Sequence, residues 1–175
     1  MNEAAGEITR NETAMRWLPA YVGIGSNLDD PARQVARAFD WLAGLNATRL
    51  VVRSPIYRTK PFGEVVQPAF VNAVAGLLTQ LAPEELLEAL RVIERDLGRA
   101  PPRERWGPRV IDLDLLVYGR ETRATDTLKL PHPGIAERDF VLYPLADIAP
   151  DLEVPGLGRV ARLRDRVANR GVERL

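Results

Sequence analysis

The stretch from Arg99 to Asp114 (RAPPRERWGPRVIDLD) contains residue types that suit a metal ion and phosphate groups. Four arginines lie ahead of two aspartates, Asp112 and Asp114. Carboxylate oxygens are hard ligands for a divalent cation such as magnesium, and guanidinium groups bind phosphate oxygens as planar forks. An Asp-x-Asp pair alone more often caps a turn or faces solvent. Together with the arginines, however, it favours phosphate-metal chemistry.

The local structure decides whether these two carboxylates can act together. Residues after Pro108 alternate between apolar and polar, a period of two that predicts a half-buried strand. On a strand, Asp112 and Asp114 point to one face with Cα atoms about 6.5–7 Å apart. On a helix they would diverge by about 200°. The two predicted faces are Ile111, Leu113, Leu115 and Val117 on one side, and Asp112, Asp114 and Leu116 on the other.

The whole chain has the composition of a soluble globular protein, with 46% hydrophobic and 27% charged residues. We expect residues 17–175 to form one domain and residues 1–16 to be a disordered extension. A net charge of zero argues against a broad surface for nucleic acid or anionic membranes. The absence of cysteine excludes disulfides and thiolate zinc sites, and fits a cytoplasmic protein. No apolar run is long enough to cross a membrane.

The elements predicted along the chain alternate between strands and helices. Strands are predicted at residues 17–24, 48–58 and 70–78, with Pro55 marking an edge or a bulge in the second. Helices are predicted after Asp29 or Asp30, with Pro31 at the first position, and over residues 82–97. With the aspartate strand, the order is β-α-β-β-α-β. The pattern predicts an α+β fold with a ferredoxin-like mixed or antiparallel sheet and helices packed on its faces.

The C-terminal third is predicted to add smaller elements. Short strands around Thr122 and Leu128 form a hairpin. A helix over residues 138–148 is interrupted near Pro144, and a final helix covers residues 160–169.

Three polar residues have both a structural and a functional interpretation. Asn72, inside an apolar strand, marks a sheet edge or bulge, or offers its amide to a flat heterocycle. Glu94, a turn before the end of its helix, is more often solvated than bound to a ligand. His132, the only histidine, lies between prolines and is more often structural or exposed.

Five segments in order resemble the 6-hydroxymethyl-7,8-dihydropterin pyrophosphokinase family. The most specific is ERWGPRVIDLDLLVYG, which ends at Gly119. The others are YVGIGSNL, SPIYRTKPFG, QPAFVNAV and LPHPGIAERDFVLYPLADIAP, and together they extend from about Tyr21 to Asp151. The resemblance implies transfer of pyrophosphate from ATP to the hydroxymethyl group of a reduced pterin, with AMP as the second product.

The resemblance also implies roles for the charged residues. Asp112 and Asp114 match the aspartates that bind two Mg²⁺ ions along the triphosphate, and Arg99 and Arg109 match the two catalytic arginines. The resemblance places Glu94, Ile111 and His132 near ATP. It therefore favours the functional interpretation of Glu94 and His132.

The pterin of this family lies between aromatic rings and is hydrogen-bonded at its edge. Phe140 matches one stacking ring, and Phe62 stands where many relatives have leucine. Phe70 occupies a position where tyrosine is common, and Trp106 resembles the tryptophan that closes over the site. Asn72 matches the amide that reads the pterin edge, supported by Thr59.

Some positions depart from the family pattern: Lys60, Pro101, Thr127 and Pro133. We expect Arg103 to substitute for the arginine that some members have at position 101. We expect altered ATP affinity or loop dynamics from these departures, with the chemistry retained.

Two alternatives remain open at this point. One is another metal-dependent ATP or nucleotidyl transferase that uses the same aspartates. The other is a non-catalytic ferredoxin-like module that binds a ligand or RNA, although two carboxylates on the sheet face would repel RNA phosphates. We expect ATP and a reduced pterin as partners, no nucleic acid or membrane, and a monomer.

Overall fold

An antiparallel sheet of long and short strands forms the centre of the computed structural model, which describes residues 16–61, 66–100 and 107–175. Its middle strands are β1 (Leu18–Ser26) and β4 (Phe70–Thr79), and β5 (Asp112–Tyr118) pairs with the other side of β1. β2 (Thr48–Arg53) and β3 (Tyr57–Thr59) pair in succession with β4, and β10 (Glu173–Arg174) pairs with β3. The strand order β10-β3-β4-β1-β5 confirms the predicted ferredoxin-like α+β fold.

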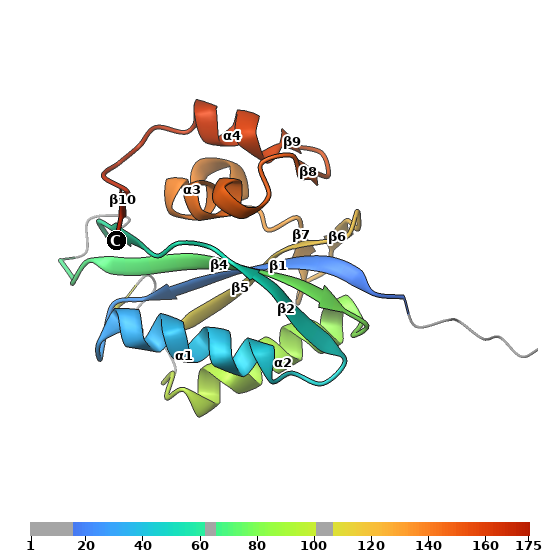
Figure 1. The fold of residues 1–175 in the computed structure, drawn as a ribbon, viewed down its shortest axis with the longest axis horizontal. Helices are drawn as coiled ribbons and strands as arrows, with labels where there is room; N and C mark the ends of the chain where they lie inside the picture. Colours follow the sequence, from blue (N-terminus) through green and yellow to red (C-terminus); the bar gives the residue numbers. More distant parts are fainter. Residues whose placement is uncertain (1–15, 62–65, 101–106) are drawn as a thin grey trace, which may run out of the picture.

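Two layers of helices enclose this sheet, and each covers a different face (Figure 1). α1 (Pro31–Ala43) and α2 (Pro83–Asp96) lie on one face, and α3 (Asp139–Ile148) and α4 (Val160–Arg166) lie on the other. The α1/α2 face encloses the larger apolar core, because side chains of β1, β4 and β5 alternate toward it. The second core packs between the sheet and α3 and α4. Among the described residues, no helix is both long and apolar enough to span a membrane.

Helix boundaries follow the local signals in the sequence. Asp30 is the N-cap of α1, where its side chain accepts a hydrogen bond from the Arg33 amide, and Pro31 takes the first helical position. In α2, the Glu85 side chain reaches back to the Ala82 amide, and two glutamates lie in the first turn. At its other end, α2 stops at Asp96, shortly before the arginine-rich segment that begins at Arg99.

The predicted single strand over residues 48–58 is wrong, because it is two strands. β2 ends at Arg53 and β3 begins at Tyr57, with Pro55 between them. Proline has no N–H to donate to a ladder. The Ser54 hydroxyl instead accepts a hydrogen bond from the Val74 amide at 2.8 Å, which holds the break against β4.

The predicted interruption at Pro144 is also wrong, because α3 continues through this buried residue. Proline costs a helix one hydrogen bond, and the apolar packing of α3 against the sheet compensates for it. The final helix is shorter than predicted, since α4 ends at Arg166 and Val167 is extended.

Smaller elements complete the chain. The predicted hairpin is confirmed as β6 (Arg123–Ala124) and β7 (Lys129–Leu130), and a second hairpin joins β8 (Glu153–Val154) to β9 (Gly158–Arg159). A 3₁₀ turn, η1 (Ile135–Glu137), leads into α3.

The face assignment of β5 is correct for both aspartates and wrong for Val117. The pairing of β1 with β5 shifts register, so that Val22 faces Leu115 while Tyr21 faces Val117. Leu116 is the extra residue of this bulge, and Val117 consequently joins it in the core beneath α3 and α4. A bulge reverses the alternation of every later residue.

Candidate active site

A pocket opens at one end of the sheet, where β1, β4 and β5 meet the beginning of α3. Its lining has two parts. The charged side comprises Arg109, Asp112, Asp114 and Arg138, and the neutral side comprises Thr59, Phe70, Asn72 and Phe140. Gln67 and Lys60 complete the rim, and the backbone of Gly23 to Gly25 forms part of the floor.

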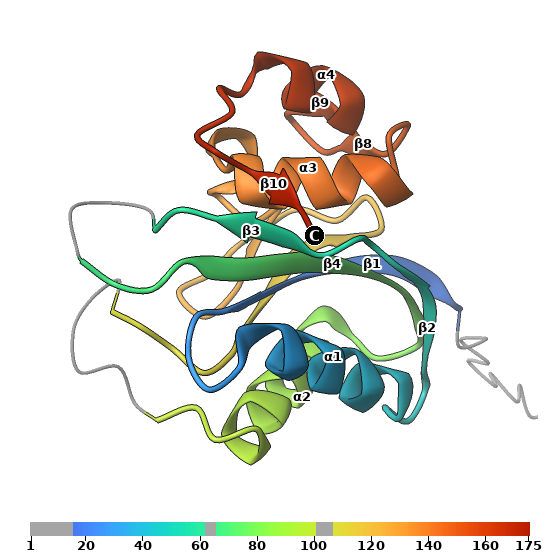
Figure 2. The same cartoon turned by 60° about the vertical axis from the view of Figure 1, so that its left-hand side comes forward.

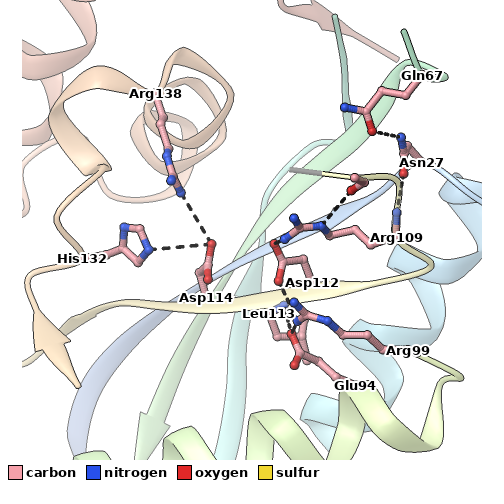
Figure 3. Close-up of polar contacts among 11 residues, drawn as sticks. Asn27, Gln67, Glu94, Arg99, Arg109, Asp112, Leu113, Asp114, His132 and Arg138 are labelled. Carbon is pink, nitrogen blue, oxygen red and sulfur yellow. Dashed lines mark hydrogen bonds and ion pairs between the residues drawn. The ribbon is translucent and has the colours of Figure 1, made fainter. Parts of the chain in front are cut away.

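Asp112 lies between Arg99 and Arg109, the two arginines to which the family resemblance assigns a catalytic role (Figure 3). Its Oδ1 accepts a hydrogen bond from Arg99 Nη1 at 2.7 Å, and its Oδ2 accepts one from Arg109 Nη1 at 2.6 Å. All three side chains are about one-quarter exposed, so these ion pairs are partly shielded from water. Arg99, Arg109 and Asp112 therefore lie together, whereas Arg103 and Arg105 lie outside the described residues.

Glu94 is buried, so the interpretation as a solvated helix residue is wrong. Its carboxylate accepts hydrogen bonds from the Leu113 amide at 2.7 Å and from Arg99. Glu94 thus connects α2 to β5, because it satisfies a backbone donor on the outer side of that strand. Burial raises the pKa of Glu94 to about 7, while the Leu113 amide and Arg99 act in the opposite direction.

Asp114 is the more open of the two aspartates. Its Oδ2 lies 3.7 Å from Arg138 Nη1 and 3.9 Å from His132 Nε2. Limited access to water raises the pKa of Asp114 to about 6, and repulsion from Asp112 adds to the effect. Two neighbouring carboxylates that repel each other are a suitable site for a cation.

His132 occupies a constrained position beside Asp114. Its Nδ1 accepts a hydrogen bond from the Gly134 amide at 3.1 Å, which assigns the proton of the neutral ring to Nε2. Burial, together with the nearby charge of Arg138, lowers the pKa of His132 to about 4. The imidazole is therefore neutral at neutral pH and presents an N–H toward Asp114.

The neutral side of the pocket is built on the centre of the sheet. Asn72 Nδ2 donates to Thr59 Oγ1 at 2.7 Å, and both residues are buried. The interpretation of Asn72 as an edge or bulge marker is wrong, because β4 pairs on both sides and is regular at this position. Gly25 faces Asn72 across the strands, and a Cβ there would lie 3.1 Å from Asn72 Oδ1. A side chain at position 25 would thus crowd the amide.

Two aromatic residues line the same pocket as this amide. Phe70 begins β4 and Phe140 lies in the first turn of α3, and both line the pocket. The Arg138 guanidinium carbon is 5.8 Å from the centre of the Phe140 ring. Phe62 and Trp106, which the sequence also predicted for this site, lie outside the described residues.

The remaining predicted positions are less directly placed in the pocket. The Ile111 side chain is fully buried in the core beneath α1 and α2, so a ligand could contact this residue only through its backbone. Thr127 and Pro133 are exposed, and positions 101 and 103 lie outside the described residues.

Arg138, Asn27 and Gln67 belong to the site, although the sequence did not predict them as site residues. The sequence predicts Arg138 only as the start of a helix. Its position two residues before Phe140 is the signal that could have identified it as a pocket residue. Asn27 is 2% exposed, and its side chain accepts from the Arg109 amide and donates to Gln67 Oε1 and the Pro68 carbonyl. Its signal was the Gly-Ser-Asn sequence at the end of a buried strand.

The fold and the pocket define a class of protein: a ferredoxin-like α+β protein with carboxylates and arginines on one side of a pocket at the end of its sheet. Residues 21–150 match the family model described as 7,8-dihydro-6-hydroxymethylpterin-pyrophosphokinase. The chain belongs to this family.

Curated relatives agree with this family assignment. The 2-amino-4-hydroxy-6-hydroxymethyldihydropteridine pyrophosphokinase of Pseudomonas aeruginosa is 47% identical over 155 residues, covering 89% of this chain and 95% of the relative. The protein of the same name from Methylorubrum extorquens is 48% identical over 137 residues, or 78% of this chain and 86% of the relative.

Solved structures confirm the fold at lower sequence identity. The wild-type HPPK-DHPS of Plasmodium falciparum with pteroate aligns with a TM-score of 0.69 and 14% identity. The alignment covers 86% of this chain and 42% of that chain. This chain therefore spans less than half the length of the structural neighbours.

Proposed function

We propose that this protein transfers a pyrophosphoryl group from ATP to the hydroxymethyl group of 6-hydroxymethyl-7,8-dihydropterin in folate biosynthesis. The products are AMP and the pterin pyrophosphate. The observation that carries the proposal is the division of one pocket into two sides. Asp112, Asp114 and the arginines suit a metal-bound triphosphate, and Asn72 with its aromatic neighbours suits a flat heterocycle.

The charged side has the donor set for Mg²⁺. The two aspartates lie on one face of β5 and both line the pocket, so their hard oxygens can bind cations between the protein and a phosphate chain. Among the described residues, no group of three or more acidic or histidine side chains forms a complete metal site. ATP phosphates and water would supply the other ligands, as magnesium prefers. We propose two ions, which would polarise the phosphoryl oxygens and offset their charge.

Arg99 and Arg109 would move part of their bonding from Asp112 to the phosphates. The hydroxymethyl oxygen of the pterin attacks the β-phosphorus, and the bond from that phosphorus to the oxygen of the α-phosphate breaks. The hydroxyl proton is released, and AMP leaves with the bridging oxygen. Negative charge grows on the oxygens around the β-phosphorus, where guanidinium groups stabilise it best.

Three further residues are proposed to contact or support the nucleotide. The neutral His132 offers Nε2–H as a donor to an anionic oxygen. Glu94 holds Arg99 and β5 in place. Ile111 is proposed to contribute backbone contacts, since its side chain is buried.

The neutral side is proposed to bind the pterin. Asn72 pairs with the heterocycle edge through its amide, and Thr59 fixes the orientation of that amide. Phe70 and Phe140 supply flat apolar surfaces for stacking. Phe62 and Trp106 are part of the same proposal on the strength of their positions in the sequence.

A product assay tests this function. The purified protein with MgATP and 6-hydroxymethyl-7,8-dihydropterin should form AMP and pterin pyrophosphate in equal amounts. Release of ADP or of free pyrophosphate with a nucleotidylated product would indicate a different transferase. Absence of any magnesium-dependent product would contradict the proposal.

A further inference from the structure

The segment that follows α4, residues 167–175, lies against the side of the pterin half of the pocket. It descends from α4 and ends as β10 on the outer edge of β3 (Figure 2). This segment lies beyond residues 21–150, the part of the chain that the family model matches. The family match therefore does not cover the contacts that this segment makes with the pocket.

Asp139 joins this segment to the beginning of α3. The residue is 3% exposed, and its carboxylate has two backbone donors. Oδ1 accepts from the Phe140 amide at 2.8 Å, and Oδ2 accepts from the Arg170 amide at 2.7 Å. Hydrogen bonds from amides to a carboxylate are among the stronger ones in proteins, so a single buried side chain fixes Phe140 to the C-terminal segment.

The C-terminal segment is itself held in a defined shape. Asn169 Oδ1 accepts from the Gly171 and Val172 amides, each at 2.8 Å. Gly171 has a φ of 97°, which glycine adopts without strain. This turn directs the Arg170 amide toward Asp139.

The same segment also contacts the opposite side of the pocket. The Lys60 side chain lies over Gly171, where a Cβ would be 3.5 Å from Lys60 Cε. Arg174 pairs with Tyr57 in β3, and the Leu175 amide donates to the Ile56 carbonyl at 2.9 Å. The segment therefore bridges the beginning of α3, which carries Arg138 and Phe140, and β3, which carries Thr59.

We propose that Asp139 and residues 167–175 form a clamp that sets the distance between the two sides of the pterin site. Asp139 is a positioning residue, since it acts through Phe140 rather than by touching the substrate. This inference rests on the proposed function. It predicts that pterin affinity depends on the C-terminal segment, whereas ATP binding and the chemical step do not.

Asp139→Ser is the variant that tests the clamp. Serine keeps an oxygen near the Phe140 amide but is too short to reach Arg170. We expect the KM for the pterin to rise about tenfold, because small displacements of a positioning group have large effects. The kcat and the KM for ATP should stay within about twofold of wild type. Asp139→Asn keeps one acceptor at full length, so its KM for the pterin should lie between the values of wild type and Asp139→Ser.

Asp147→Ser is the matched control. Asp147 is also in α3 but ties the helix directly to β3, because its Oδ2 accepts from the Tyr57 hydroxyl at 2.5 Å. It lies near the far end of the helix from the pocket. Its loss should lower the melting temperature with the pterin KM unchanged.

Deletion of residues 168–175 keeps Asp139 and removes its partner. It should raise the pterin KM to the level of Asp139→Ser, and the combined variant should show no further increase. This deletion carries the test if Asp139→Ser does not fold. An unchanged pterin KM in an active Asp139→Ser or deletion variant overturns the clamp, as does an equal change in kcat and both KM values. Inactive wild-type protein overturns the proposed function instead, and a pterin-analogue titration of the same variants then decides the clamp separately.

Discussion

The two sides of the pocket are built on different principles. The charged side depends on side chains that neutralise one another: Asp112 holds Arg99 and Arg109, and Asp114 lies near Arg138 and His132. The neutral side depends on rigid backbone, because Asn72 and Thr59 lie on paired strands and hydrogen-bond to each other.

This difference indicates a division of labour. Ion pairs between side chains can exchange partners when phosphates and cations arrive, so the charged side can follow charge as it develops in the reaction. An amide held on a central strand keeps one position, so it can distinguish ligands only by the shape and hydrogen-bonding groups of their edge. Substitutions on the charged side should therefore lower turnover, and those on the neutral side should weaken pterin binding.

The largest effect is expected from Asp112→Ala. This change removes a proposed metal ligand and leaves the arginines without their shared partner. We expect kcat to fall by on the order of a thousandfold or more, measured as AMP formation. Asp165→Ala removes an exposed aspartate that pairs with Arg164 and should have no effect on kcat. A loss below about tenfold in the Asp112 variant would contradict a role in metal binding.

Arg109→Ala should lower turnover by about a hundredfold and change pterin affinity little. Its guanidinium is proposed to stabilise charge that appears only during transfer. Steady-state kinetics would give kcat, and calorimetry with a pterin analogue would give the dissociation constant. Arg91→Ala, which removes an exposed arginine from α2, is the control. Comparable losses in turnover and pterin binding would show that Arg109 has only a positional role.

Asn72→Leu should have the opposite signature. It keeps a side chain of similar size but removes the amide that is proposed to read the pterin edge. We expect the pterin KM to rise by roughly ten- to a hundredfold while the KM for ATP is retained. Thr59→Val, which removes only the hydroxyl that orients this amide, should give a smaller change in the same direction. A fall in kcat alone would break the proposed division between the two sides.

The smallest effect concerns stability and pH. Because the pKa of Glu94 is raised from 4.5 to about 7, the folded protein retains a proton that the unfolded chain releases across this interval. The contribution of Glu94 to the free energy of unfolding is thus greatest below pH 4.5 and falls as the pH rises toward 7.

Glu94→Gln removes this dependence and keeps an acceptor for the Leu113 amide. Relative to the variant, wild type should lose about 2.5 kcal/mol between pH 5 and pH 7.5, as urea denaturation would measure. Glu88→Gln, on the exposed side of α2, should leave the pH profile of wild type unchanged. A constant difference between wild type and Glu94→Gln at every pH would show that Glu94 titrates normally.

The sequence was sufficient where one local pattern determined the structure. The alternation after Pro108 placed Asp112 and Asp114 on one face of a strand, and the cap of α1 and the span of α2 followed from residues in or beside these helices. It was insufficient where the outcome depended on a partner elsewhere. Val117 changed face because β1 imposes a bulge, and Glu94 is buried because β5 presents an amide to it.

In the site, too, the sequence did not predict residues whose role depends on contacts with distant parts of the chain. Arg138 and Asn27 belong to elements far from residues 99–114 along the chain and reach the pocket only through the fold. Pro144 lies inside a helix because apolar packing of α3 outweighs one missing hydrogen bond, which residue preferences alone do not reveal.

The most direct test of the carboxylate pair is a titration with Mn²⁺, a paramagnetic substitute for Mg²⁺, followed by electron paramagnetic resonance. It should be carried out with a non-hydrolysable ATP analogue present, on wild type and on Asp112→Asn/Asp114→Asn. We predict that wild type with the analogue binds two Mn²⁺ ions, and that the double variant loses at least one of them while remaining folded. Equal Mn²⁺ binding by the two proteins would contradict the assignment of these aspartates to the metal site.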